Sequence, residues 1–369
     1  MGDTLKSNAP ACVTLSALEG GHLTLPEKLF ITDADPEKRA TVPSLCFLIQ
    51  HKSISSDGKL KQTNLIFDLG LKRDLNGYPP KQQDHIAARQ PVISHPDCAD
   101  SLRYGTAYAE RLRVGQIQDV SPILIDPAKD IHAVILSHVH WDHVGTPSDF
   151  ESASFVVGAG TLDLLRNGAG PLYPADIFND EELPVERTVE FPPVTRDAKD
   201  DTSIYENGPH VPKNTIAPEG ALTKLASNLP PHVLDNWSWQ QLASFPHTLD
   251  FFGDGSVYVI DSPGHLYGHV NLLVRVVERK YVYLGGDCCH DPRILSGERG
   301  IALYEDGWGG LRSVHVHTGV ARRTLDQIEA FVKGSRVEGD NAGVEVEVVV
   351  AHDGVWREKN HDRFWPGSF

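Results

Sequence analysis

The chain has 369 residues, 34 basic and 50 acidic side chains, and a formal net charge of −16. Such an acidic chain is a poor partner for nucleic acid or an anionic membrane surface, because phosphate binding needs a clustered basic field. A hydrophobic content of 40% and a charged content of 23% are typical of a globular protein that buries a core. The 18 histidines stand out, since histidine is the commonest metal ligand.

Targeting signals and paired cysteines are not apparent in the sequence. Residues 1–20 lack the basic start and apolar run of a secretory signal, and no stretch reaches the ~18 consecutive apolar residues of a membrane helix. The five cysteines are odd in number and have no CxxC spacing, which argues against a disulfide framework and a thiolate zinc site. We therefore expect free thiols, no membrane partner and a cytoplasmic location.

In chain order, short runs of apolar, β-branched and aromatic residues predict strands, with two helices among them in the first half. The strands are predicted at residues 45–50, 64–69, 133–136, 154–157, 249–252, 256–260, 271–277, 281–284 and 344–350. The helices are predicted at residues 98–114, 161–166 and 325–332. Strands outnumber the interleaved helices, so the fold class is mixed α/β.

Two stretches, residues 73–122 and 168–247, interrupt this pattern. The first is polar, and the second is rich in Pro, Asp and Asn with poor periodicity. Long irregular stretches inside a compact domain are usually functional loops or lids. We predict a single domain, residues 1–369, in which these two insertions form the substrate pocket.

The strongest local signal follows the predicted strand at residues 133–136. His138, His140, Asp142 and His143 are four side chains that can bind metal, within six residues at a strand end. Zinc and similar divalent metals bind imidazole nitrogen and carboxylate oxygen readily. The alternative is a histidine-rich surface loop, which the abrupt change from a buried strand to polar residues disfavours.

The pattern His138-x-His140-x-Asp142-His143 resembles the signature of the metallo-β-lactamase superfamily. Three later segments resemble its other motifs in the same order, and the match spans roughly residues 42–355. These are the Pro-Gly-His segment that contains His265, the strand that leads to Asp287, and the last strand, which leads to His352. The resemblance implies an αββα sandwich, in which two mixed sheets are flanked by helices.

The resemblance also implies a dinuclear centre with two Zn²⁺ per chain, other divalent metals being possible. One metal would take His138, His140 and His265, and the other Asp142, His143 and His352, with Asp287 bridging both. Five neutral imidazoles and two carboxylates leave a two-zinc site with a charge of +2, which favours a bridging hydroxide. That hydroxide would attack the carbonyl of a substrate.

Further histidines lie outside this set. His269 could orient a ligand, but we favour a role in holding its loop by a backbone hydrogen bond. His315 and His317 alternate in a valine-rich run, for which we favour a structural role.

The motif spacing is most similar to that of the dinuclear-zinc, quorum-quenching lactonases. Those enzymes usually carry a tyrosine three residues after the bridging aspartate, where this chain has His290. His290 could donate a hydrogen bond or protonate a leaving group, or it could begin a helix and face elsewhere. We therefore expect Asp142, Asp287 and His290 to be catalytic, and the substrate to be a cyclic ester or amide, a lactone or a lactam.

Aromatic residues near the predicted centre are candidates for the pocket wall, namely Trp141, Tyr173 and Trp308. Six tryptophans and the acidic charge predict a neutral or apolar small-molecule substrate. Two alternatives in the same superfamily stay open, a persulfide dioxygenase with a single iron and a thioesterase similar to glyoxalase II. The metal content of the purified protein would separate the iron enzyme from the zinc hydrolase.

Overall fold

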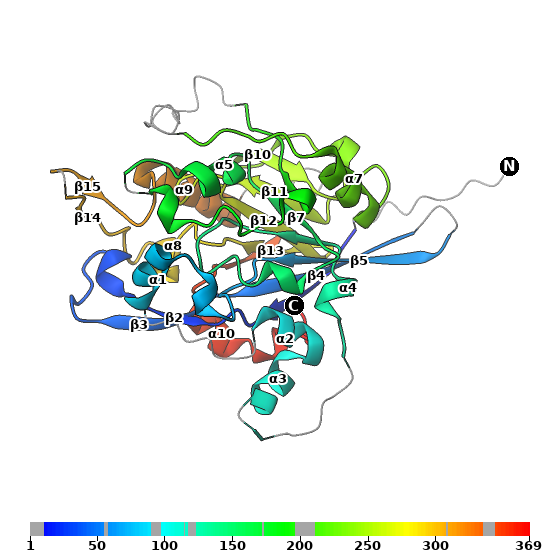
Figure 1. The fold of residues 1–369 in the computed structure, drawn as a ribbon, viewed down its shortest axis with the longest axis horizontal. Coiled ribbons are helices and arrows are strands. Elements are labelled where there is room, and N and C mark those ends of the chain that lie inside the picture. The colour runs from blue at the N-terminus through cyan, green and yellow to red at the C-terminus, as the bar shows by residue number, and fades with distance from the viewer. Residues whose placement is uncertain are drawn as a thin grey trace.

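In the computed structural model two six-stranded sheets form the centre of the molecule (Figure 1). The structure describes residues 11–54, 58–89, 97–113, 115–116, 123–171, 173–195, 211–307, 309–334 and 344–369. The first sheet has the order β1-β4-β5-β6-β7-β8, antiparallel from β1 to β5 and parallel from β5 to β8. Its strands are Thr14–Leu18, Cys46–Ile54, Leu60–Phe67, Ala133–Ile135, Ser154–Val157 and Thr188–Glu190.

The second sheet has the order β16-β13-β12-β11-β10-β9, in which only the β13–β16 pair is parallel. Its strands, from β9 to β13 and then β16, are Gln240–Leu242, Phe245–Asp250, Val257–Asp261, Val270–Val277, Lys280–Leu284 and Glu345–Val349. Two hairpins lie outside the sheets, β2–β3 (His22–Pro26 and Arg39–Pro43) and β14–β15 (Tyr304–Glu305 and Leu311–Arg312). Figure 1 shows the β4–β5 hairpin extending from the molecule on the side opposite β14–β15.

Three apolar layers hold the sheets and helices together. The central layer joins the two sheets, with Phe67 of the first and Leu272 of the second among its fully buried members. On the outer face of the first sheet, α2 and α5 contribute Leu102 and Leu164 to a second layer, and on the outer face of the second sheet α9 contributes Ile328 to a third. This arrangement is the predicted αββα sandwich with two mixed sheets.

The helices of the described residues are mostly short. From α1 to α5 they are Pro80–Ala87, Cys98–Tyr104, Thr106–Arg113, Pro127–Asp130 and Thr161–Asn167. From α7 to α10 they are Glu219–Asn228, Pro292–Leu295, Thr318–Gly334 and Gly354–Lys359. Among the described residues, no helix is both long and apolar enough to cross a membrane.

Three of the predicted segments differ from the elements that the structure contains. The single helix expected at 98–114 is divided into α2 and α3 at Gly105, whose φ of 77° ends α2. The helix expected at 325–332 is the C-terminal part of the longer α9. The stretch 168–247 is less irregular than expected, since it contains β8, α7 and β9. In α7 only Ala221 and Leu225 are buried, too few apolar positions to give a clear helical period.

The loop after β5 approaches the N-terminal part of the chain very closely at Gly70. Gly70 has a φ of +72°, and a Cβ there would lie 2.2 Å from the Gly20 carbonyl oxygen. Gly70→Ala is therefore expected to lower the free energy of unfolding by about 2 kcal/mol or more, through backbone strain and this clash. Gly220→Ala is the control, because its Cβ would meet nothing within 4 Å inside α7. Urea unfolding of both variants checks this; equal stability of Gly70→Ala and the wild type would contradict it.

Candidate metal centre

The predicted metal ligands meet at one edge of the sandwich because the strands before them all end there. In the first sheet the parallel strands β5 and β6 lead to Asp68 and to the loop 137–143. In the second sheet, β11 and β13 are both antiparallel to β12, and β16 is parallel to β13. The strands β11, β13 and β16 therefore run in the same direction. They lead to His265, Asp287 and His352 respectively.

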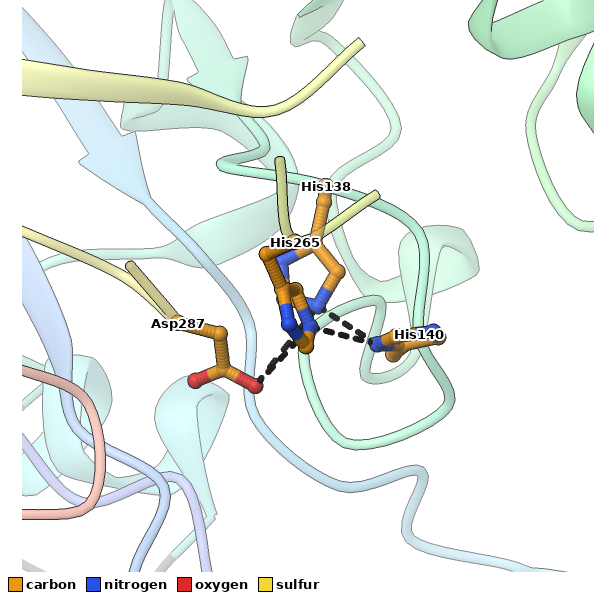
Figure 2. A group of neighbouring side chains, drawn as sticks. All are labelled: His138, His140, His265 and Asp287. Carbon is orange, nitrogen blue, oxygen red and sulfur yellow. Dashed lines mark hydrogen bonds and ion pairs between the residues drawn. The ribbon is translucent and has the colours of Figure 1, made fainter. Parts of the chain in front are cut away.

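The first donor set consists of three imidazoles and one carboxylate (Figure 2). His138 Nε2 and His265 Nε2 each lie 2.9 Å from His140 Nδ1. Asp287 Oδ2 lies 3.7 Å from His138 Nε2 and 3.5 Å from His265 Nε2. The four donor atoms lie within 4.8 Å of one another, so a single ion can contact all of them.

The second donor set lies on the other side of the Asp287 carboxylate. It consists of Asp142, His143 and His352, whose donor atoms also lie within 4.8 Å of one another. Asp287 Oδ1 lies 3.3 Å from His143 Nε2 and 3.1 Å from His352 Nε2. The two carboxylate oxygens of Asp287 therefore face different donor sets, one oxygen to each.

The protonation of the first set suits a metal ion, because imidazole binds metal through a neutral nitrogen. Burial lowers the pKa of His138 and His265 well below the usual value, and it lowers the pKa of His140 to about 3. These three histidines are therefore neutral at pH 7.

In the second set two buried polar atoms face each other without a well-formed hydrogen bond. His143 Nε2 and Asp287 Oδ1 are both buried and lie 3.3 Å apart. Burial disfavours the imidazolium, but the Asp287 and Asp68 carboxylates outweigh it and hold the pKa of His143 well above its usual value. A cation between these groups would take the place of that proton. The residues present thus fit a metal ion at both donor sets.

Asp68, which the sequence analysis did not single out, orients ligands of both sets. Its Oδ2 accepts hydrogen bonds from His143 Nδ1 at 2.8 Å and from the Ser137 hydroxyl at 2.7 Å. The Ser137 oxygen in turn lies 3.0 Å from His138 Nδ1. With their Nδ1 protons used in this way, His143 and His138 present Nε2 to the metal sets.

Asp68→Ala is expected to weaken metal binding about 10- to 100-fold, because His143 and His138 lose the partner that fixes their tautomer. Competition with a metal-sensitive dye would measure the two affinities. Asp74→Ala is the control, since Asp74 caps a short helical turn on the surface, away from both sets. Wild-type affinity in Asp68→Ala would show that the ligands need no such support.

Two other ligands are fixed by neighbouring groups. His352 Nδ1 donates to the Pro43 carbonyl oxygen at 2.7 Å, which leaves Nε2 for the second set. The Asp287 backbone N–H donates to His269 Nε2 at 3.2 Å, and His269 Nδ1 lies 2.9 Å from the Ser262 hydroxyl. His269 thus makes the backbone hydrogen bond that the sequence analysis favoured for it, and that bond holds the loop of Asp287.

His290 and His315 lie closer to the centre than a purely structural role requires. His290 Nε2 lies 3.1 Å from Asp287 Oδ2, so the ring faces the site, and its Nδ1 is buried without a hydrogen bond. His315 Nδ1 lies 3.2 Å from His265 Nδ1. Together His265, His290 and His315 form another group that could hold a metal ion. His317 lies farther out, where its Nε2 is 3.3 Å from the Tyr267 hydroxyl.

A cavity of about 390 Å³ opens onto the two donor sets. Six members of the centre line it, namely His140, Asp142, His265, Asp287, His290 and His352. Both stretches predicted as insertions contribute to its wall, the first through α1 and the second through residues 171–178. Trp141 and Tyr173, predicted for this wall, also line the cavity, and Trp308 lies outside the described residues.

Curated proteins with similar sequences include metal hydrolases and lactamases. A metallo-hydrolase of Annulohypoxylon moriforme is 29% identical over 258 residues, 69% of this chain and 50% of that protein. A cytochrome P450 monooxygenase of Penicillium brevicompactum is 27% identical over 344 residues, 90% of this chain and 32% of that protein. A gamma-lactamase of Fusarium pseudograminearum is 28% identical over 253 residues, 67% of this chain and 45% of that protein. The chain thus spans half or less of the length of these three relatives.

Solved structures with this fold include quorum-quenching enzymes. A quorum-quenching N-acyl homoserine lactone lactonase has a TM-score of 0.52 at 14% identity, over 98% of this chain and 100% of that one. An N-acyl homoserine lactone hydrolase with its product bound at the catalytic metal centre has a TM-score of 0.53 at 13% identity, with the same coverage. No family model matches the sequence. The sandwich and the solved structures thus show that the chain has the metallo-β-lactamase fold, and its curated relatives include a metallo-hydrolase and a gamma-lactamase.

Proposed function

We propose that the protein is a zinc-dependent hydrolase that opens a cyclic ester or amide, a lactone or a lactam. The observation that carries this proposal is the position of Asp287 between two complete donor sets, with one oxygen toward each. The names of the relatives, a metallo-hydrolase and a gamma-lactamase, support hydrolysis of a small molecule. The complete second set supports two metals rather than the single iron of a persulfide dioxygenase.

One zinc would be held by His138, His140 and His265. The other would be held by Asp142, His143 and His352, and Asp287 would contact both. The nitrogen-rich set with two carboxylates suits zinc better than the oxygen-binding cations Mg²⁺ and Ca²⁺. A bound zinc pair would supply Lewis acidity to a carbonyl oxygen and lower the pKa of a bound water to about 7.

The protein residues bring the substrate to that chemistry and handle the proton of the leaving group. A small molecule in the cavity would meet His140, Asp142 and His290, whereas His138 and His143 are buried and do not line the cavity. Trp141 and Tyr173 supply flat apolar surface beside the donor sets. His290, which touches Asp287 and lines the cavity, is placed to give a proton to the leaving oxygen or nitrogen.

His290→Gln is expected to lower kcat about 100-fold while the zinc content stays at the wild-type value, because general acid catalysis is worth 10²- to 10⁴-fold. Steady-state kinetics and elemental analysis of the same samples measure both quantities. His232→Gln, which changes a histidine whose side chain is 84% exposed, is the control. Loss of zinc in parallel with activity would make His290 a metal ligand instead of a proton donor.

The proposed function is tested with zinc-loaded protein on a panel of lactones, lactams, thioesters and phosphodiesters. Hydrolysis of at least one lactone or lactam, faster than of any thioester or phosphodiester, is the expected result. A preference for thioesters would instead identify the protein as a thioesterase. Oxygen consumption on a persulfide by iron-loaded protein would identify it as a dioxygenase. None of the five cysteines forms a disulfide, which supports the cytoplasm as the proposed location.

A further inference from the structure

Two arginines, Arg89 and Arg312, line the cavity that opens onto the metal centre. Arg89 follows α1, and Arg312 ends β15, so the two come from segments far apart in the sequence. Both side chains are half-buried. Two cations in one cavity are unexpected in a chain with a net charge of −16.

Neither arginine has an acidic partner among the residues that the structure describes. Arg89 Nη1 donates to the His85 carbonyl oxygen at 2.8 Å, and the Arg312 guanidinium lies 5.2 Å from the centre of the Tyr304 ring. Other arginines of the chain do form ion pairs, as Arg73 does with Asp97 and Asp149 at 2.6 Å each. The cavity arginines thus keep most of their hydrogen-bond donors for another partner.

Burial and mutual repulsion both act against this arrangement. Burial lowers the pKa of Arg89, Asp142 and Tyr304 act in the opposite direction, and the charges of Arg39 and Arg312 lower it further. Placing two guanidinium groups that form no ion pair in the partly desolvated wall of one cavity costs free energy, which a bound anion offsets. Arginine binds carboxylates through paired N–H donors, so a carboxylate is the anion that this geometry suits.

We propose that the substrate carries a carboxylate group, which Arg89 and Arg312 bind while its ring carbonyl lies at the metal centre. This inference rests on the proposed function and specifies its substrate class, an anionic lactone or lactam. It replaces the neutral or apolar substrate that net charge and tryptophan content predict. The net charge is a sum over the whole surface and says nothing about the sign of charge in one cavity.

The test compares two probes of the same shape, 3,4-dihydrocoumarin-6-carboxylic acid and its carboxamide, with zinc-loaded protein. For the wild type, kcat/KM is expected to be at least tenfold higher for the acid. In Arg89→Gln and in Arg312→Gln that preference should fall about tenfold, mainly because KM for the acid rises. Arg322→Gln, which removes an exposed charge of α9 outside the cavity, should keep the wild-type preference.

Equal kcat/KM values for the two probes in the wild type, or an undiminished preference in both arginine variants, would overturn the inference while leaving lactone hydrolysis intact. Calorimetric titration with terephthalate tests the anion site separately, in case neither probe is hydrolysed. If neither probe is hydrolysed, but terephthalate binds the wild type and Arg322→Gln at least tenfold more tightly than the two cavity variants, the anion site stands and the proposed reaction fails. Equal terephthalate affinities in all four proteins would count against the anion site.

Discussion

Asp287→Ala is expected to abolish hydrolysis, with a fall in kcat/KM of at least about a thousandfold, or about 4 kcal/mol in the activation barrier. The reason is the position of Asp287, since its two oxygens face different donor sets and its removal disconnects them. His143 and His352 would also lose the carboxylate that lies 3.3 Å and 3.1 Å from their Nε2 atoms. The zinc content should therefore fall below two per chain, while the fold, which packs around the sheets, is kept.

The control is Asp235→Ala, which removes one carboxylate whose side chain is 72% exposed. It should keep the wild-type activity and metal content. Circular dichroism would show whether each variant is folded, so that loss of activity in Asp287→Ala is not confused with unfolding. Full activity in a folded Asp287→Ala protein would contradict the bridging position that we assign to this residue.

Removal of the metal is expected to abolish activity and to lower the melting temperature by roughly 10 °C. A ligand present at 1,000 times its dissociation constant stabilises the folded state by about 4 kcal/mol, and each kcal/mol shifts the melting temperature of a chain of this size by a few degrees. The fall in melting temperature has a local cause. Without the metal, no cation lies between the five imidazoles and the buried carboxylates of Asp68, Asp142 and Asp287. Dialysis against a chelator, followed by scanning calorimetry, measures it.

Added Zn²⁺ should restore both activity and melting temperature, and added Mg²⁺ should restore neither, because magnesium prefers oxygen ligands. Full activity in protein that elemental analysis shows to be free of metal would contradict a metal-dependent reaction. An unchanged melting temperature would contradict the fit between the donor sets and the ion.

That the proposed metal donors lie close together could be predicted from the sequence, because each follows a strand with a clear apolar pattern. His138 to His143 follow β6, and Asp287 follows β13, so the local motif also gives the position in the fold. Asp68 occupies the same kind of position after β5 and was missed, since a lone aspartate before Leu69-Gly70 has the composition of an ordinary turn. Its partner His143 is 75 positions away, and only the parallel pairing of β5 with β6 brings the two together.

Other features depend on contacts that no local pattern records. Strand β1 is short, and its only partner in the sheet, β4, begins 28 residues after β1 ends. The hairpin β2–β3 was missed for a different reason, since each of its strands has only five residues and ends in a proline, and β3 buries only that proline. That Arg89 and Arg312 share a cavity, and that neither forms an ion pair with another described residue, follows from the tertiary structure alone.

The metal content of the purified, active protein decides whether the chain is a dinuclear zinc hydrolase. Inductively coupled plasma mass spectrometry on the same sample used for lactone and lactam assays gives the metal and its ratio to the chain. We expect close to two zinc ions per chain and hydrolysis that rises in proportion to zinc occupancy. One iron per chain, with oxygen consumed on a persulfide and no hydrolysis of any cyclic ester or amide, would contradict it.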